Sequence, residues 1–134
     1  MGAWGIGSFE NDDAMDWLDS FEAEGPGAIE TALTDVVELS KDDYLESTEA
    51  CHALAAAELV AAARDGDVTS LPDTFGGQFA EHTEAINEAD LAALARRAVL
   101  RVLRASELKE LWDETDDADE WAESVRELAD RLRG

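Results

Sequence analysis

Apolar residues recur at helical spacing from the start of the chain. They stand at i, i+3, i+4 and i+7 in the first such stretch, which predicts an amphipathic helix with Ala14, Trp17, Leu18 and Phe21 on its apolar face. Asn11 is a favoured N-cap, and Asp12 and Asp13 follow where carboxylates stabilise the positive end of a helix dipole. A Gly-Pro-Gly tripeptide at 25–27 ends this helix, and the same period predicts a second helix over residues 28–39.

A third helix is predicted from Ser47 or Thr48 to about Arg64, and it is rich in alanine. Its residues are apolar nearly all round, which is typical of a helix buried on every side. We therefore expect this helix to be the centre of the fold. Glu58 is the one ionisable residue within its apolar stretch at 53–63.

The second half of the chain begins with residues 65–84, which lack a clear period and predict a long loop with a short helical turn. A fourth helix is predicted to start after Asn87, with Asp90 completing a capping box, and to run to about Arg104. Ser106 then caps a short helix. A last helix follows an acidic stretch, and its predicted buried face consists of Trp121, Val125, Leu128 and Leu132.

These elements predict a single all-α domain over residues 1–134, because no segment shows the alternation of a strand. We expect five or six helices, with the glycine-rich, non-helical N-terminal segment packed on them. A chain of 134 residues fits one domain and can bury a core without disulfides or a structural metal. Cys51 is the single cysteine, which excludes an internal disulfide.

The composition adds a strong negative charge to this picture. The chain has 33 acidic and 10 basic residues, a formal net charge of -23, and a normal apolar share of 46% that argues against disorder. Phosphate binding depends on Lys and Arg, so we expect neither direct nucleic-acid binding nor attraction to anionic membranes. No apolar run is long enough to span a membrane, and no signal peptide is recognised, so a cytoplasmic location is expected.

The acidity itself has two interpretations, an adaptation that keeps the protein soluble or a surface that recognises a basic partner. The charges are also patterned. On the first predicted helix the carboxylates of Asp12, Asp16 and Asp19 share the face opposite the apolar stripe. A candidate basic strip lies on the fourth predicted helix and consists of Arg97, Arg101 and Arg104, with Arg96 beside it. This strip fits either salt bridges within the fold or contact with an anionic ligand or a second subunit.

No residue pattern predicts a metal, a cofactor or a catalytic residue. His52 and His82 stand alone, without the i, i+4 spacing of a metal-binding pair. The acidic run at 113–120 fails as a calcium loop, because Ala118 and Ser124 occupy the positions of the required glycine and bidentate glutamate.

Glu58 is the most informative ionisable residue of the chain. A buried carboxylate has to be paired, hydrogen-bonded or held neutral. Three interpretations stay open. Glu58 is a structural carboxylate bonded to an indole, an arginine or a backbone amide. Alternatively, it is exposed on a narrow polar strip, or it is a functional acid in a pocket.

Several motifs resemble the bacterial domain-of-unknown-function 4259 family. They are Gly2-Ala3-Trp4-Gly5, Phe9-Glu10-Asn11-Asp12, Asp16-Trp17-Leu18, residues 55–61, and Ser106 to Trp112, with Trp121 and Arg131-Leu132 also similar. The resemblance implies a small stand-alone bacterial protein without an assigned activity, and it supplies no catalytic residues. It also marks a characteristic set that we expect to lie close together, with the N-terminal segment folded onto the third helix: Trp4, Trp17, Glu58 and Trp112.

Three functions are compatible with these patterns. The favoured one is a non-enzymatic protein-interaction module that neutralises a basic partner, as immunity proteins or nucleic-acid mimics do. The second is a small-molecule binding protein or enzyme with Glu58 in an aromatic-lined pocket. The third is a structural protein that assembles into a homo-oligomer. A deep pocket around Glu58 would favour the second function, and a tightly packed Glu58 would favour the first.

Overall fold

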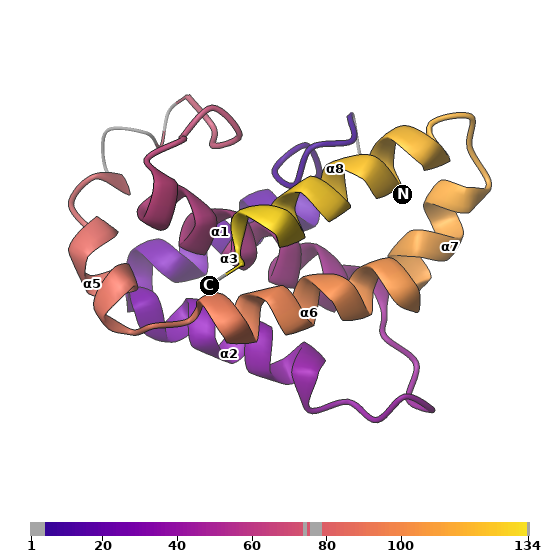
Figure 1. The fold of residues 1–134 in the computed structure, drawn as a ribbon, viewed down its shortest axis with the longest axis horizontal. Coiled ribbons are helices and arrows are strands. Elements are labelled where there is room, and N and C mark those ends of the chain that lie inside the picture. The colour runs from indigo at the N-terminus through magenta and orange to yellow at the C-terminus, as the bar shows by residue number, and fades with distance from the viewer. Residues whose placement is uncertain (1–4, 74, 76–78, 134) are drawn as a thin grey trace.

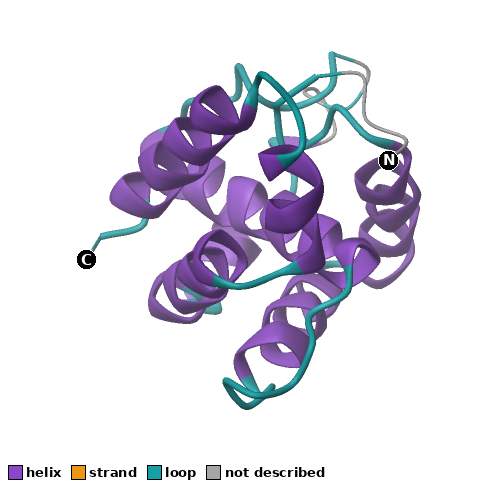
Figure 2. Ribbon diagram, turned by 90° about the vertical axis from the view of Figure 1, so that its right-hand side faces the viewer, coloured by secondary structure: helices purple, strands orange, loops and turns teal. Residues whose placement is uncertain are grey.

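Seven α-helices and no strand are formed by the residues that the computed structural model describes, which are 5–73, 75 and 79–133 (Figures 1 and 2). The prediction of an all-α domain is confirmed, and the number of helices is one above the expected range. The helices are α1 (Asp12–Glu24), α2 (Pro26–Val37), α3 (Ser47–Asp65), α5 (Thr83–Glu88), α6 (Ala92–Arg104), α7 (Glu107–Asp113) and α8 (Ala118–Arg131).

Helix α3 is the centre of the fold, as its composition predicts. It contacts each of the other six helices in the described part of the chain. Every residue from Ala50 to Ala63 except His52 is buried, because a helix surrounded by neighbours has no face left for solvent. The alanines allow the surrounding helices to approach closely. Helices α2 and α6 pack against α3 and against each other, and α8 packs on α6 (Figure 1).

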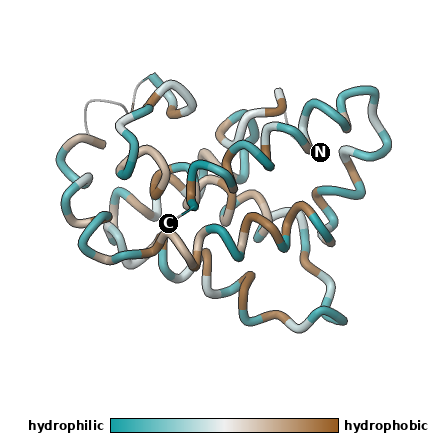
Figure 3. Tube along the Cα trace, in the orientation of Figure 1, coloured by the Kyte–Doolittle hydropathy of each residue, from teal (hydrophilic) through white to brown (hydrophobic). Residues whose placement is uncertain are grey.

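The helices around α3 bury apolar stripes, and hydrophilic positions recur between apolar ones along α1, α6 and α8 (Figure 3). On α1 the buried residues are Ala14, Trp17, Leu18 and Phe21, which is the predicted stripe. The predicted cap is also present, since the Asn11 side chain accepts a hydrogen bond from the Ala14 N–H at 2.8 Å. None of the helices among the described residues combines the length and the apolar character that crossing a membrane requires.

Two glycines in left-handed backbone conformations end helices at the predicted places. Gly25 (φ 73°) separates α1 from α2, where Pro26 occupies the first turn. Gly66 (φ 76°) ends α3, and its N–H donates to the Ala62 carbonyl at 2.9 Å. Only glycine adopts positive φ at little cost, so the positions of these two residues fix the helix ends.

The predicted start of a helix after Asn87 is wrong. Asn87 lies in α5, and its side-chain amide donates to the Ala63 carbonyl at 2.8 Å. The residue thus caps the C-terminal end of α3 instead of beginning a new helix. Asp90 adopts φ 52°, a left-handed conformation that interrupts the helical path before α6 begins.

Ser106 connects α6 to α7 through two hydrogen bonds. Its Oγ donates to the Val102 carbonyl at 2.8 Å and accepts from the Lys109 N–H at 3.0 Å. Because the side chain is buried and caps a helix, we expect Ser106→Ala to lower the free energy of unfolding by about 1–2 kcal/mol. Urea denaturation would measure the change. Ser20→Ala, at an exposed position of α1, is the control, and an equal loss in both variants would contradict the capping role.

Candidate functional site

Glu58 lies on the side of α3 that faces the N-terminal segment and α8. Its residue is 6% exposed, and both carboxylate oxygens have partners within the fold. Oε1 accepts from the Ser8 Oγ at 3.1 Å, and Oε2 accepts from the Arg131 Nη1 at 3.1 Å. Asn11 holds Ser8 in place, since the Asn11 side-chain amide donates to the Ser8 carbonyl at 3.3 Å. Glu58 therefore connects the N-terminal segment, the central helix and the last helix.

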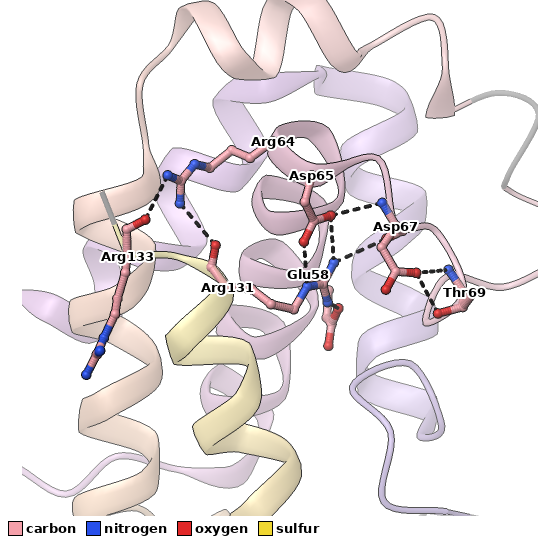
Figure 4. Close-up of polar contacts among 7 residues, drawn as sticks. All are labelled: Glu58, Arg64, Asp65, Asp67, Thr69, Arg131 and Arg133. Carbon is pink, nitrogen blue, oxygen red and sulfur yellow. Dashed lines mark hydrogen bonds and ion pairs between the residues drawn. The ribbon is translucent and has the colours of Figure 1, made fainter.

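Arg131 divides its guanidinium between two carboxylates (Figure 4). Besides its bond to Glu58, it contacts Asp65 through two nitrogens, with Nε to Oδ2 at 2.9 Å and Nη2 to Oδ1 at 3.2 Å. Nη2 also donates to the Asp67 carbonyl at 3.2 Å. The turn after α3 at Gly66 brings these acceptors together, and the paired N–H groups of a guanidinium match a carboxylate.

Arg64 forms a second connection between the ends of α3 and α8. Its Nη1 donates to the Arg131 carbonyl at 3.1 Å, and its Nη2 donates to the Arg133 carbonyl at 2.9 Å (Figure 4). These carbonyls lie at the C-terminal end of α8, where no intrahelical donor is available and a positive charge is favourable. Each helix end thus supplies an arginine to the other.

The pKa values of three carboxyl groups at this site are shifted from their ordinary values. Burial raises the pKa of Glu58 above its ordinary value, although Arg131 and Ser8 act in the opposite direction. Burial has the larger effect, so the net direction is upward. Hydrogen bonds from Arg131 lower the pKa of Asp65, and hydrogen bonds from the Thr69 hydroxyl and N–H lower that of Asp67.

Two hollows border the N-terminal segment, and Glu58 lines neither of them. One, of about 480 Å³, lies between Phe9, Glu10 and the loop at 69–73. The other is small. It lies against the N-terminal segment and contains about 10 Å³, which is roughly the room for one water molecule. Cys51, Trp112 and Trp121 contribute to its wall. The two indole rings are stacked, with their centroids 6.4 Å apart. The aromatic side chains line this region, and Glu58 is buried outside it.

The four residues of the expected cluster occupy different surroundings. Trp4 lies outside the described residues. Trp17 packs against Phe21 on α1, with ring centroids 6.1 Å apart. Trp112 and Glu58 flank the same N-terminal segment, the first through the small hollow and the second through its bond to Ser8. The expected packing of the N-terminal segment on α3 is present at that bond.

The candidate basic strip contains arginines of two kinds. Arg101 is buried, and it donates to the carbonyls of Ser40 at 2.9 Å, Asp43 at 2.6 Å and Ala105 at 3.1 Å, with a longer contact to Leu39 at 3.4 Å. Its partners are thus backbone carbonyls and not carboxylates. Arg97 and Arg104 lie on the same face of α6, but both are exposed.

Two further candidate chemistries can be located. Cys51 is buried, and burial raises the pKa of its thiol to about 12, so this group is a poor nucleophile. Among the residues that the structure describes, no group of three His, Cys, Asp or Glu residues could hold a metal ion.

The acidic face of α1 is arranged as its sequence predicts. Asp12, Asp16 and Asp19 are exposed, while Trp17 and Leu18 on the other side are buried. No Lys or Arg precedes Lys41 in the sequence. Within the described part of the chain, the basic members of the ion pairs are Lys109, Arg131 and Arg133, and their carboxylate partners lie outside α1.

The model of one protein family, described as "Domain of unknown function (DUF4259)", matches residues 2–124. Because this match covers most of the sequence, the chain belongs to that family, as its motifs suggest. Comparisons with curated proteins and with solved structures found no match.

Proposed function

We propose that this member of the domain-of-unknown-function 4259 family is a non-enzymatic protein-interaction module whose acidic face meets a basic protein partner. The observation that carries the proposal is the outer face of α1, with its exposed Asp12, Asp16 and Asp19. This face has no basic side chain in its own helix or in α2. Its charge is therefore directed to solvent instead of being neutralised within these two helices.

The environment of Glu58 also supports an interaction role over small-molecule chemistry. Both carboxylate oxygens are occupied by bonds from Ser8 and Arg131, and Glu58 lines neither of the two hollows beside the N-terminal segment. Its carboxylate is therefore not part of the wall of a space that could hold a ligand. The acid that stood out in the sequence thus has a structural task in joining three segments of the fold.

An acidic face acts mainly on encounter and orientation. Complementary charge speeds association and suppresses partners of the wrong sign. The partner we propose presents a surface rich in Lys and Arg, of the kind that an immunity protein or a nucleic-acid mimic covers. The resemblance to bacterial proteins and the single reduced cysteine support a bacterial cytoplasmic setting.

The test is affinity capture from a lysate with three forms of the protein. These are the wild type, an α1 variant with Asp12→Asn, Asp16→Asn and Asp19→Asn, and a matched α8 variant with Glu120→Gln, Glu123→Gln and Glu127→Gln. We expect the wild type and the α8 variant to capture the same basic protein at low salt. The α1 variant should capture at least about tenfold less of this protein. Salt at 1 M should abolish capture, because the Debye length then falls to about 3 Å.

The matched variants distinguish recognition from mere solubility. Each removes three negative charges from exposed helical positions, so a nonspecific effect of net charge would change capture equally in both. Equal loss, or the absence of a basic partner at low salt, would leave the charge as a solubility adaptation and contradict the proposal.

A further inference from the structure

A groove of about 290 Å³ runs between α2 and α6, and it shares no residue with the Glu58 site. Its apolar wall consists of two residues of α2, the second residue after α2, and one residue of α6: Val36, Val37, Leu39 and Leu100. Its other wall consists of the three residues of the basic strip, Arg97, Arg101 and Arg104. The two helices lie side by side along this line (Figure 1).

A second hollow of about 370 Å³ continues from the first, since Arg101 and Arg104 line both. It adds Lys41 and Lys109 to the basic side chains of this region. Five of the ten basic residues of the sequence therefore border these two hollows. In a chain with a net charge of -23, this is a local concentration of positive charge.

Only some of these basic side chains form hydrogen bonds or ion pairs within the described part of the protein. Arg101 is saturated by backbone carbonyls, and Lys109 is paired with Asp113 at 2.7 Å. Arg97 and Arg104 are exposed, and neither takes part in an ion pair with another described residue.

Three acidic residues, Asp42, Asp43 and Glu110, also line the second hollow, whereas none lines the first. The Asp43 Oδ2 accepts from the Ser40 N–H at 2.9 Å. The Tyr44 hydroxyl donates to the Glu110 Oε2 at 2.7 Å, which leaves that carboxylate bound to a neutral donor. Tyr44 itself is 59% exposed and lies at the edge of the second hollow.

We propose that the groove between α2 and α6 binds a small anionic amphiphile, with its carboxylate at Arg97 and Arg104 and its apolar chain along Val37 and Leu100. An apolar wall beside exposed guanidinium groups is the chemistry that such a molecule requires. The net charge of the protein selects against polyanions and anionic bilayers, whereas a single carboxylate meets the least repulsion. The volume of about 290 Å³ is at the lower end of the range of ligand pockets, which suits a short acyl chain and not a larger molecule.

The experiment uses octanoate, below its micelle-forming concentration, as the probe. Titration calorimetry should show saturable binding of one octanoate per chain, and backbone amide shifts should locate it on α2 and α6. Butanoate and 1-octanol test the two halves of the site, since the first shortens the apolar chain and the second removes the charge. We expect each to bind at least about tenfold more weakly, because butanoate lacks four methylenes that contribute up to roughly 0.8 kcal/mol each when fully buried, and a charged hydrogen bond contributes more than a neutral one.

Three single Arg→Gln substitutions, each of which removes one positive charge, test which arginines bind the carboxylate of octanoate. Arg97→Gln and Arg104→Gln should each weaken octanoate binding by about fivefold, the scale of a partly exposed ion pair. Arg126→Gln, on the exposed face of α8 and outside the groove, should leave binding unchanged. Urea denaturation of all three variants checks that the fold is retained.

Several outcomes would overturn the proposal. The first group consists of nonsaturable octanoate binding, equal affinity for 1-octanol, or an equal loss in Arg126→Gln. Light scattering of the free protein could give another contradicting outcome. If the protein self-associates and Arg97→Gln abolishes this, the groove is occupied by a second copy of the chain. If the protein sediments with phosphatidylglycerol vesicles and Arg97→Gln or Arg104→Gln prevents this, the ligand of the groove is a bilayer.

Discussion

Arg101→Met is expected to lower the free energy of unfolding by about 3 kcal/mol. The guanidinium is buried and donates to the carbonyls of Ser40, Asp43 and Ala105. Methionine fills much of the space of the side-chain stem but supplies no donor, so these carbonyls lose their partners. Urea denaturation measures the loss, and an unchanged slope with denaturant would show that the same surface is exposed on unfolding.

The control for this substitution lies on the same face of the same helix. Arg97→Met and Arg104→Met remove exposed guanidinium groups and should each change the free energy of unfolding by less than about 0.5 kcal/mol. The loss of free energy of unfolding in Arg101→Lys should lie between that of Arg101→Met and that of the two control variants. An ammonium group keeps the charge but lacks the planar guanidinium that reaches several carbonyls. If Arg101→Met costs no more than Arg97→Met, the buried contacts contribute nothing to stability.

The loss should be greatest in the segment between α2 and α3. This segment spans residues 38–46, and Arg101 holds its middle through Ser40 and Asp43. Its far end is fixed to α7 by a bond from the Glu107 N–H to the Leu45 carbonyl at 2.8 Å. With Arg101 removed, hydrogen exchange should accelerate in the middle of the segment more than at Leu45.

The sequence predicts the helices wherever an apolar period and a strong cap coincide. The stripe of α1 and the cap at Asn11 are both local, and both are found in the structure. The burial of α3 follows from its lack of a polar face, and glycines mark the ends of two helices. These features depend on residues within a few positions of each other, so they can be read without knowledge of the fold.

The break between α5 and α6 could not be predicted in this way. Asn87 and Asp90 have the spacing of a capping box, and local preference alone therefore favours a helix start. The structure uses Asn87 to cap α3 through the Ala63 carbonyl, a contact across 24 positions of the chain. A tertiary hydrogen bond thus outweighs the local signal, and Asp90 adopts the left-handed conformation between the two helices.

The partners of Glu58 were beyond sequence reasoning for a similar reason. An arginine was among the expected classes of partner, but Arg131 is 73 positions away and Ser8 is 50. The spacing of Arg97, Arg101 and Arg104 likewise places three residues on one face without showing that the segment at 38–46 covers only the middle one. Periodicity assigns a residue to a face, and the packing of distant segments decides what that face meets.

The cluster around Glu58 gives the second large effect, which we expect in Arg131→Met. At pH 7 this change should lower the free energy of unfolding by about 3 kcal/mol, because a buried carboxylate loses its only cation among the described residues. Asp65 loses the same partner, but it is more exposed and its share of the loss is smaller. Arg133→Met is the control, since Arg133 is exposed and its contact with Asp130 is 3.6 Å long.

The cost of Arg131→Met should also depend on pH, with a sign that the pKa of Glu58 determines. Burial raises this pKa in the folded state, so the folded protein holds the Glu58 proton more tightly than the unfolded chain. The contribution of the neutral group is fully present below the ordinary pKa of 4.5 and is lost as pH rises through the raised pKa. Removing Arg131 raises the pKa of Glu58 further, which makes this loss larger at pH 7 than at pH 5.

A comparison at these two pH values isolates Glu58 from its acidic neighbours. Asp65 and Asp67 have pKa values lowered from 3.8, so their contributions are lost only as pH falls below that value, and both stay ionised at pH 5 and 7. We expect Arg131→Met to cost about 1 kcal/mol less at pH 5 than at pH 7. The double variant Glu58→Gln with Arg131→Met is compared with the single variant Glu58→Gln, and this cost of Arg131→Met should be the same at both pH values, because neither protein retains the titrating group. A pH dependence that persists in the double variant, or a cost of Arg131→Met that is equal at pH 5 and 7, would place the effect on another group than Glu58.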